Sequence, residues 1–380
     1  MVDTTAWNTD MIRPNAAGMH PASKNSRLGR LRKRITEAGA DGFFSLAPPD
    51  NQYLTEFMGS TSAVIVTARE ALFLCDFRYT EQAARQVAGY RVEEVSGNLV
   101  TRVGERLKTL GVKTAAFDPV LLSVAQRDAI KAVFPGTPEP LADAVSSLRV
   151  VKSREEIRRI RAASLLAEGV LLDLVNTLRT GVTERELAAQ FEYEFKRRGA
   201  EGASFDTIAL FGSRGSMPHG RPGDRPLRGG DIVLLDLGCR KDGYCSDLTR
   251  TYVFDRIPGA WLGEIYEVTL VAQRTALKAV RPGVRCRDVD AVARGIIADA
   301  GYGKCFGHGL GHGVGIEVHE NPRLNAESET VLKEGMVITV EPGIYVPKRG
   351  GVRIEDLVVV TKQGCEVLTK SPKELTVLKA

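Results

Sequence analysis

Residues 230–238 read GDIVLLDLG, and residues 335–343 read GMVITVEPG. The two stretches match in register, so that Asp236 of the first falls on Glu341 of the second. Each is an apolar run bounded by glycines, which is typical of a strand buried on both faces. The pair therefore predicts two copies of one buried strand, each with a carboxylate at the same point.

A second match lies upstream of these strands. RTGVTEREL at 179–187 aligns with RPGVRCRDV at 281–289, and Gly199 aligns with Gly301 at the same offset. Helix-start and helix-end signals that recur at a constant offset indicate an internal repeat. We therefore expect residues 149–380 to hold two copies of a helix, helix, strand-hairpin unit.

The first hairpin is predicted to bring a second acid beside Asp236. A turn centred on residues 242–243, within the turn signal KDGY, places Gly238 opposite Asp247. Asp236 and Asp247 then share one face of the sheet as diagonal neighbours. A lone carboxylate in such a strand would be costly or driven neutral, so the pair requires a cation or several donors.

The second copy repeats this arrangement with two further acids. VITVEPGIYV, a turn at KRGG and VRIEDLVVV bring Glu341 and Glu355 to the same place. The glycine-walled stretch FGHGLGHGVGIEVHE at 306–320 adds three of the five histidines in the chain. The acids could instead pair with arginines such as Arg250 and Arg353, but the repeat and the histidine cluster favour a shared ion.

Four carboxylates and one imidazole form a set of mainly hard oxygen ligands. Such a set favours Mn²⁺, Co²⁺ or Fe²⁺, with Zn²⁺ also compatible, and four ionised acids need about two divalent cations for charge balance. Water held between two such ions loses a proton near neutral pH and becomes a nucleophile. The predicted chemistry is metal-assisted hydrolysis. The chain has no HExxH motif, and GHGLGHGVG fits neither a dinucleotide fingerprint nor a P-loop.

The part of the chain before the repeat alternates strand-like and helix-like runs. DGFFSLA, SAVIVTA, EALFLCD and KTAAFD predict strands, while RLGRLRKRITEAG, TEQAARQVAG and LVTRVGERLKTL predict helices. This alternation predicts an α/β domain at 25–148, preceded by a loose tail at 1–24. The Pro- and Gly-rich stretch FPGTPEPLAD at 134–143 is expected to mark the boundary with the C-terminal domain at 149–380.

Bulk composition argues against several classes of partner. The net charge is +5 from 52 basic and 47 acidic residues, which is too mild to indicate nucleic acid. No apolar run approaches the ~20 residues of a membrane span, and the N-terminus lacks a secretory signal. The six cysteines are scattered without a CxxC pair, which is typical of reduced thiols. We therefore expect a cytoplasmic protein with neither nucleic-acid nor membrane partners.

These motifs together resemble those of the creatinase/aminopeptidase P/prolidase group of peptidases, the M24 "pita-bread" metallopeptidases. HGLGHGVGIEVHE, EPGIY and GVRIED carry the resemblance, and FLCDFRYTEQA is similar to the smaller domain that precedes the catalytic one in that group. The resemblance covers the chain from about residue 25 onward. It implies an α/β N-terminal domain of creatinase/prolidase type, followed by an α+β pita-bread catalytic domain with an internal pseudo-twofold repeat.

The resemblance also implies a role for each ligand. Asp236 would hold one metal ion, while Asp247 and Glu355 would bridge two ions. His312 and Glu341 would complete the second ion. Glu341 would also act as general base or acid for a hydroxide that bridges the ions.

Further residues are implied to surround the substrate. His219 matches a histidine that contacts the scissile peptide, and His319 matches one that steadies the tetrahedral intermediate. His308 matches a pocket residue, and we expect it to hydrogen-bond the substrate together with His319. Arg353 matches a residue that supports the ligands or binds the substrate carboxylate. Tyr345 is a weaker candidate.

The implied activity is hydrolysis of the bond between an N-terminal residue and proline in small peptides. An Xaa-Pro aminopeptidase takes longer peptides, whereas an Xaa-Pro dipeptidase (prolidase) must grip a free carboxylate, for which an arginine is suited. Candidate cations at the mouth of the site are Arg221, Arg225, Arg228, Lys348, Arg349 and Arg353. The resemblance leads us to expect the aminopeptidase, with the dipeptidase as the alternative.

Other functions on the same fold remain as remoter alternatives. A non-catalytic binding module and creatinase-like C–N hydrolysis are disfavoured by the complete ligand set. A methionine aminopeptidase shares the ligands but usually lacks the preceding domain. The resemblance also implies a homodimer.

Overall fold

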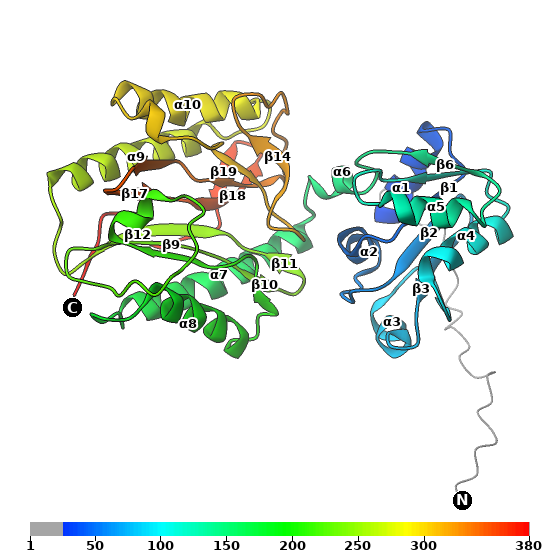
Figure 1. The fold of residues 1–380 in the computed structure, drawn as a ribbon. Coiled ribbons are helices and arrows are strands. Elements are labelled where there is room, and N and C mark those ends of the chain that lie inside the picture. The colour runs from blue at the N-terminus through cyan, green and yellow to red at the C-terminus, as the bar shows by residue number, and fades with distance from the viewer. Residues whose placement is uncertain (1–25, 380) are drawn as a thin grey trace, which may run out of the picture. The chain divides into compact units, whose positions relative to one another are not determined.

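The computed structural model describes residues 26–379, and these form two compact units that divide between Leu148 and Arg149 (Figure 1). The tail predicted at 1–24 lies outside the described residues. No helix within residues 26–379 combines the length and apolarity that a membrane span requires.

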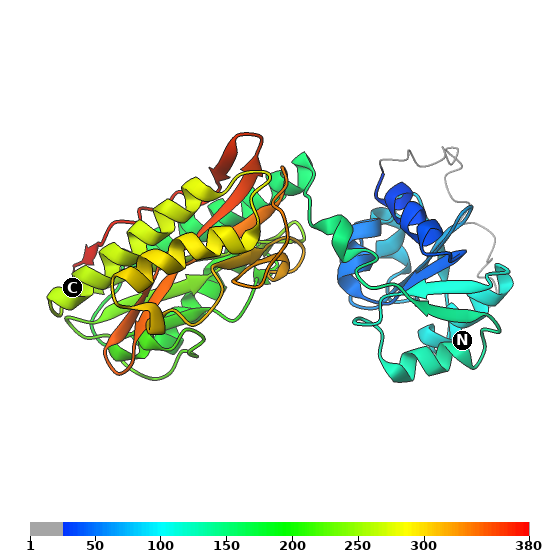
Figure 2. The ribbon, with the colours of Figure 1, turned by 90° about the horizontal axis from the view of Figure 1, so that it is seen from above.

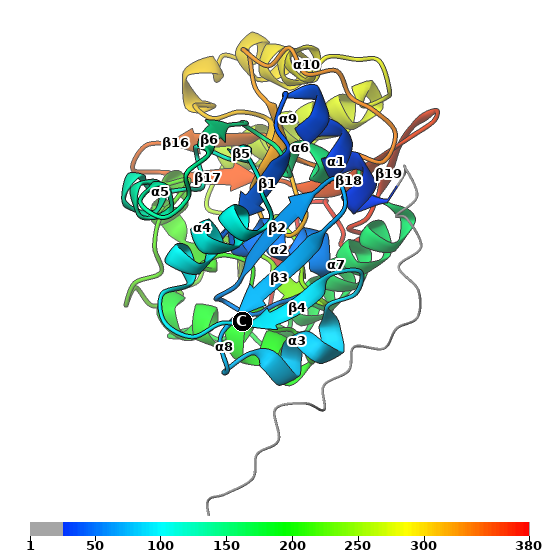
Figure 3. The same cartoon turned by 90° about the vertical axis from the view of Figure 1, so that its right-hand side faces the viewer.

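The first unit is a six-stranded sheet with helices packed against it. Its strands are β1 (Gly42–Ser45), β2 (Ala63–Thr67), β3 (Ala71–Cys75), β4 (Arg91–Glu94), β5 (Thr114–Phe117) and β6 (Thr137–Pro140). Its helices are α1 (Arg27–Glu37), α2 (Pro48–Thr55), α3 (Thr80–Gln86), α4 (Leu99–Thr109) and α5 (Val124–Lys131), and α6 (Ser146–Arg149) follows at the boundary. The strand order is β4–β3–β2–β1–β5–β6, and Figure 3 shows β1 to β4 succeeding one another across the sheet.

The predicted α/β organisation of this unit is confirmed, but the Pro- and Gly-rich stretch at 134–143 belongs to the first unit and does not separate the two units. Residues Thr137–Pro140 form β6, which runs parallel to β5 at the edge of the sheet. Proline is tolerated on an edge strand, where it does not remove a hydrogen bond from the interior of the sheet. Pro-rich composition therefore marked a sheet edge here, and not a linker.

The second unit contains two copies of a helix, helix, strand-hairpin arrangement. The first copy consists of α7 (Arg154–Val175), α8 (Glu184–Arg197), β7 (Gly202–Ala203), β8 (Ile208–Phe211), β9 (Ile232–Leu237), β10 (Cys239–Lys241), β11 (Tyr244–Cys245) and β12 (Leu248–Phe254). The second consists of α9 (Ala260–Ala279), α10 (Cys286–Asp299), β13 (Gly311–Gly313), β14 (Glu320–Leu324), β15 (Val337–Val340), β16 (Gly343–Val346), β17 (Gly350–Arg353), β18 (Asp356–Thr361) and β19 (Gly364–Val367). Strand β20 (Val377–Leu378) then pairs with β12.

The second unit is layered, with helix pairs on the outer faces of its sheets (Figure 1). The sheet β20–β12–β9–β8 packs against α7 and α8 through one apolar core. The sheet β14–β13–β15–β18–β19 packs against α9 and α10 through another, and Figure 2 shows these two helices (yellow) side by side. The two sheets meet where the Glu355 N–H, just ahead of β18, donates to the Thr249 carbonyl oxygen on β12 at 3.1 Å, and the acids lie at this junction.

The repeat predicted from the sequence is confirmed in the helices. Helix α8 begins at Glu184 and α10 at Cys286, which are corresponding positions of the two matched stretches. Both helices are followed by a glycine with left-handed backbone, Gly199 at φ 86° and Gly301 at φ 88°. Glycine is favoured there because a Cβ atom is strained at positive φ.

The predicted register of the first hairpin is also confirmed. Asp236 pairs opposite Thr249 in the β9–β12 ladder, and β10 and β11 continue the same register around a turn at residues 242–243. Gly238 lies where the ladder is interrupted, and a Cβ atom there would come within 2.0 Å of the Ser246 carbonyl oxygen. The close approach of the two strands beside the acids therefore requires glycine.

Candidate metal centre

Three carboxylates converge between the two hairpins. Asp236, Asp247 and Glu355 offer oxygen atoms that all lie within 4.8 Å of one another. Asp236 stands near the end of β9, Asp247 directly precedes β12, and Glu355 directly precedes β18. Asp247 and Glu355 are 5% and 2% exposed, so the cluster lies in the protein interior.

The second hairpin places Glu341 and Glu355 at facing positions. Gly343 pairs with Arg353 in the β16–β17 ladder, and Val340 pairs with Asp356 in the β15–β18 ladder. Both ladders have the same register, and the two glutamates occupy the gap between them. The predicted meeting of these acids is confirmed.

His312 faces the acids with its Nε2 atom. This atom lies 3.3 Å from Glu341 Oε1 and 3.5 Å from Asp247 Oδ2. The other ring nitrogen, Nδ1, lies 3.1 Å from the carbonyl oxygen of Gly313. Because a carbonyl only accepts, Nδ1 must carry a proton. A bound cation would then take the Nε2 lone pair, as metal-ligating histidines commonly arrange their two nitrogens.

The electrostatics of the cluster call for added positive charge. Burial raises the pKa of Asp247 and of Glu355 well above the ordinary values, and the neighbouring carboxylates raise both further. Burial also raises the pKa of Asp236, although Arg353 opposes this shift. Burial opposes the ionisation of Glu341 as well, but its contact with His312 prevails and lowers its pKa to about 2.

The donor set fits a divalent metal ion. Among the described residues, Asp236 Oδ1 is buried and has no hydrogen-bond partner, although a buried carboxylate oxygen without a partner is costly. Four carboxylates and an imidazole are ligands that suit Mn²⁺, Fe²⁺, Co²⁺ or Zn²⁺. A cation placed among these groups would satisfy the free oxygen and relieve the mutual repulsion of the acids.

A cavity of about 550 Å³ opens onto the acids. It is lined by all five predicted ligands and by His219, His308, His319, Arg221, Arg323 and Arg353. A volume of this size suits a small-molecule ligand. The structure thus brings every predicted ligand and every histidine of the predicted site to one cavity.

Arg353 is held behind the acids. Its Nη2 donates to Asp236 Oδ2 at 2.5 Å, and its Nη1 donates to the Tyr345 hydroxyl at 2.7 Å. Its Nε donates to Thr249 Oγ1 at 3.0 Å, and the same hydroxyl donates to Glu355 Oε2 at 2.7 Å. With only 3% of the residue exposed, Arg353 is committed to the ligands and is not free for a substrate carboxylate.

His308 is likewise engaged by the protein. Its Nδ1 lies 2.8 Å from the Gly309 carbonyl oxygen and must donate to it. Its Nε2 lies 2.9 Å from the Tyr345 hydroxyl, which accepts from Arg353 and therefore donates its own proton to His308. Burial lowers the pKa of His308, in keeping with a neutral ring. Neither ring nitrogen is left for the substrate contact that we expected.

His319 and His219 stand nearer the solvent. The His319 ring centroid lies 4.3 Å from that of His312, and burial together with His312 lowers the pKa of His319 to about 4. His319 is therefore neutral at neutral pH and retains an N–H to donate. His219 is exposed at the cavity wall.

Most of the cations expected at the mouth of the site lie elsewhere. Arg225 forms an ion pair with Asp231 at 2.7 Å, and Arg349 stacks on Trp261 at 4.3 Å. The cavity lining includes neither of them, nor Arg228 or Lys348.

Arg323 is a cavity residue that the sequence analysis missed. It lies on β14 opposite His312 in the β13–β14 pairing, and its side chain is exposed. Among the described residues no ion pair to it is present. Arg323 reaches the cavity because residues 321–324 (NPRL) pair with the strand at 311–313 (GHG). The local sequence pattern of neither segment predicts that pairing.

Comparison with known families agrees with this geometry. Residues 158–362 match the model of metallopeptidase family M24, and residues 27–151 match the creatinase/prolidase N-terminal domain. The predicted resemblance is thereby confirmed for both parts of the chain.

Individual relatives cover nearly the whole chain. An Xaa-Pro dipeptidase of Pyrococcus furiosus is 39% identical over 354 residues, which cover 92% of this chain and 99% of that protein. The solved structure of an Xaa-Pro dipeptidase from Bacillus anthracis is 39% identical with a TM-score of 0.90, covering 93% of this chain and 99% of that one. The structure of an X-Pro aminopeptidase from Thermotoga maritima is 36% identical with a TM-score of 0.85, covering 91% and 100%.

The acid cluster, the duplicated hairpins and the family matches lead to one conclusion. The chain belongs to metallopeptidase family M24, with a creatinase/prolidase N-terminal domain ahead of a pita-bread catalytic domain.

Proposed function

We propose that this protein is a metal-dependent Xaa-Pro dipeptidase. The observation that carries the proposal is a cavity lined by the acid cluster and by Arg323, a cation that forms no ion pair within residues 26–379. The relatives named above as dipeptidases support it, since they are similar over nearly the whole chain. This proposal replaces our expectation of an aminopeptidase. An Xaa-Pro aminopeptidase remains the second candidate, because the similar structure from Thermotoga maritima is an X-Pro aminopeptidase.

In this proposal Asp236, Asp247, His312, Glu341 and Glu355 hold two divalent cations. We place Mn²⁺ first, with Co²⁺, Fe²⁺ and Zn²⁺ as alternatives. The bound ions would supply an acidified water and polarise the scissile carbonyl. Homodimer formation and a cytoplasmic location stay predictions of the sequence.

The residues around the ligands would move the protons and steady the charge. Glu341 would accept a proton from the attacking water and return it to the proline nitrogen as the C–N bond breaks. Thr339 Oγ1, which donates to Glu341 Oε1 at 3.0 Å, holds that carboxylate in place. His319 and His219 would donate hydrogen bonds to the carbonyl oxygen as it gains negative charge.

Arg323 is the proposed anchor for the free carboxylate of the dipeptide. Three arginines line the cavity, and one of them, Arg353, is already bound to Asp236. Arg323 and Arg221 are both exposed and line the cavity. Arg323 lies on β14, opposite His312 on β13. A guanidinium in this position can bind a carboxylate with two parallel hydrogen bonds.

An amino-acid release assay tests the proposed function. We expect Mn²⁺-loaded protein to release alanine from Ala-Pro and to release much less from Ala-Pro-Ala. Chelation should abolish release, and added Mn²⁺ should restore it. Comparable kcat/KM values for both peptides would make the protein an aminopeptidase, and no release with metal bound would indicate a binding module.

Replacing Arg323 by glutamine should raise the KM for Ala-Pro by about 10- to 100-fold, with a smaller change in kcat. The reason is the loss of a charge-assisted hydrogen bond, worth about 1.5–3 kcal/mol. The measurement is steady-state kinetics on Ala-Pro and on its C-terminal amide, for which the effect should vanish. If Arg221→Gln has the effect and Arg323→Gln does not, the carboxylate is held by Arg221 instead.

A further inference from the structure

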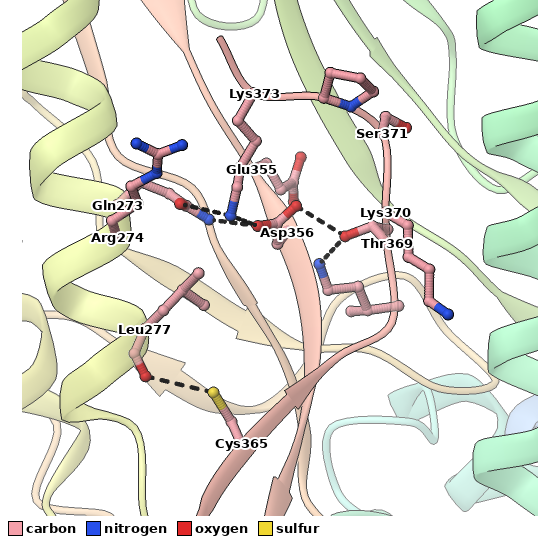
Figure 4. Close-up of polar contacts among 12 residues, drawn as sticks. Gln273, Arg274, Leu277, Glu355, Asp356, Cys365, Thr369, Lys370, Ser371 and Lys373 are labelled. Carbon is pink, nitrogen blue, oxygen red and sulfur yellow. Dashed lines mark hydrogen bonds and ion pairs between the residues drawn. The ribbon is translucent and has the colours of Figure 1, made fainter.

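A short segment of the chain that does not line the cavity is linked through Arg250 to the backbone of Glu355. Residues 370–373, read KSPK and called the strap below, follow β19 and precede β20. Ser371 is buried, and Lys373 extends its side chain toward Asp356, the neighbour of Glu355 (Figure 4). The strap has no place in the proposed reaction, yet buried polar groups fix it from several directions.

One face of the strap is held by a buried carboxylate. Glu168 on α7 is 5% exposed. Its Oε1 accepts from the backbone N–H groups of Lys370 and Ser371 and from the Ser371 hydroxyl, each at 2.5 Å. The peptide groups of the strap are therefore fixed by direct hydrogen bonds to a helix.

The carbonyl groups of the strap are bound by Arg250 on β12. Its Nη2 donates to the Ser371 carbonyl at 2.8 Å, and its Nε donates to the Pro372 carbonyl at 3.1 Å. Its Nη1 donates to the carbonyl oxygen of Glu355 itself. A single guanidinium, 1% exposed, thus joins the strap to the backbone of a predicted metal ligand.

Asp356 forms the second link between the strap and Glu355. Its Oδ2 accepts from Lys373 Nζ at 2.6 Å and from Gln273 Nε2 at 2.8 Å. Its Oδ1 accepts from Arg250 Nη2 at 2.8 Å and from Thr369 Oγ1 at 3.0 Å. Figure 4 shows Lys373 and Gln273 meeting Asp356 from one side and Thr369 from the other.

The carboxylate of Glu355 has little support of its own. Among the described residues its side chain accepts one hydrogen bond, from Thr249 Oγ1 at 2.7 Å. Its direction is therefore set mainly by its backbone. That backbone is fixed by the contact of its N–H with the Thr249 carbonyl at 3.1 Å, by Arg250 on its own carbonyl, and by Asp356 next to it.

We propose that the strap is a positioning element for Glu355. Lys373 and Arg250 fix Asp356 and the Glu355 carbonyl, and so direct the Glu355 carboxylate into the acid cluster. The inference rests on the proposed metal centre and assigns a role to residues that touch neither metal nor substrate. Groups that orient a metal ligand in this way typically change metal affinity by about 10- to 100-fold when removed.

Replacing Lys373 by methionine tests the proposal, because this change removes the ammonium and keeps an unbranched apolar side chain that reaches as far as the lysine Cε atom. Lys373→Arg is the conservative variant, and Lys362→Met, at an exposed lysine between β18 and β19, is the matched control. The measurements are calorimetric titration of the metal-free protein with Mn²⁺ and the unfolding temperature of the metal-free protein.

We expect Lys373→Met to lower the Mn²⁺ affinity about tenfold, Lys373→Arg to restore most of it, and Lys362→Met to leave it unchanged. An Mn²⁺ affinity of Lys373→Met equal to that of the wild type overturns the proposal, even if the unfolding temperature falls. A wild-type protein that binds no Mn²⁺ overturns the proposed metal centre instead.

A second variant keeps the test decisive if Lys373→Met does not fold. Thr369→Val keeps the shape of the side chain but removes the hydrogen bond that Oγ1 donates to Asp356 and the one that it accepts from the Leu357 N–H. We expect a smaller loss of Mn²⁺ affinity in the same direction. An unchanged affinity in a folded Thr369→Val protein then overturns the proposal.

Discussion

Replacing Asp247 by asparagine is expected to abolish the hydrolysis of Xaa-Pro dipeptides and, at the same time, to stabilise the metal-free protein near neutral pH. The rate should fall by on the order of 10³-fold or more, because the metal centre is expected to supply several kcal/mol of stabilisation. The gain in stability follows from electrostatics, since Asp247 is a buried acid among other acids.

The sign of the stability change follows from the raised pKa of Asp247. The folded protein holds a proton on this carboxyl at pH values where an unfolded aspartate, with a pKa of about 3.9, has lost it. Folding stability therefore falls as the pH rises from about 4 to the folded pKa, and stays lower above it. An asparagine side chain does not ionise, so Asp247→Asn avoids this loss of folding stability. Its stability relative to the wild type therefore increases with pH over this range. His308 and His319 titrate in both proteins, and their direct contributions cancel in the comparison.

Thermal unfolding of metal-free protein at about pH 5 and about pH 7.5 measures this difference. Asp242→Asn is the control, because Asp242 is an exposed acid in the turn of the same hairpin. Added Mn²⁺ should raise the unfolding temperature of the wild type and the control far more than that of Asp247→Asn. Full activity of Asp247→Asn without metal would rule out the proposed mechanism.

Replacing Arg353 by methionine should lower the free energy of unfolding of the second unit by about 3–5 kcal/mol. This is the usual cost of removing one partner from a buried ion pair. The change leaves Asp236 Oδ2 without its cation and the Tyr345 hydroxyl without its donor, in a place where Arg353 is 3% exposed. Denaturant unfolding of the metal-free protein is the measurement, so that metal binding does not mask the loss.

Arg185→Met is the matched control for this experiment. Arg185 pairs with Asp224 at 2.9 Å, but both side chains are largely exposed, so its loss should have a much smaller effect on stability than the loss of Arg353. Equal effects of the two substitutions would show that Arg353 does not hold Asp236 through a buried ion pair.

The acid cluster could be predicted from the sequence because its signals are local. Asp236 and Glu341 each interrupt an apolar run, and a KDGY turn fixes which residue faces Gly238. A strand has a side-chain period of two, so one turn position determines the register of the whole hairpin. The repeat then carried the same reasoning over to Glu355.

Contacts that depend on pairing between distant segments of the chain could not be predicted from the sequence. Arg323 lies beside His312 only because β13 and β14 pair, and no periodicity in NPRL predicts that contact. Arg353 looked equally suited to support ligands or to bind a substrate until its contact with Asp236 was seen. Asp356, next to a predicted ligand, gave no sign that Lys373 reaches it.

The division of the predicted ligands between two hairpins has a consequence for protein synthesis. A growing chain exposes Asp236 and Asp247 well before β15 to β18 have left the ribosome, and it completes the strap later still. Half of the cluster offers an ion Asp236 and Asp247 without His312, Glu341 and Glu355, so a prematurely terminated chain lacks most of the predicted ligands. Metal uptake is therefore expected to follow completion of the second unit.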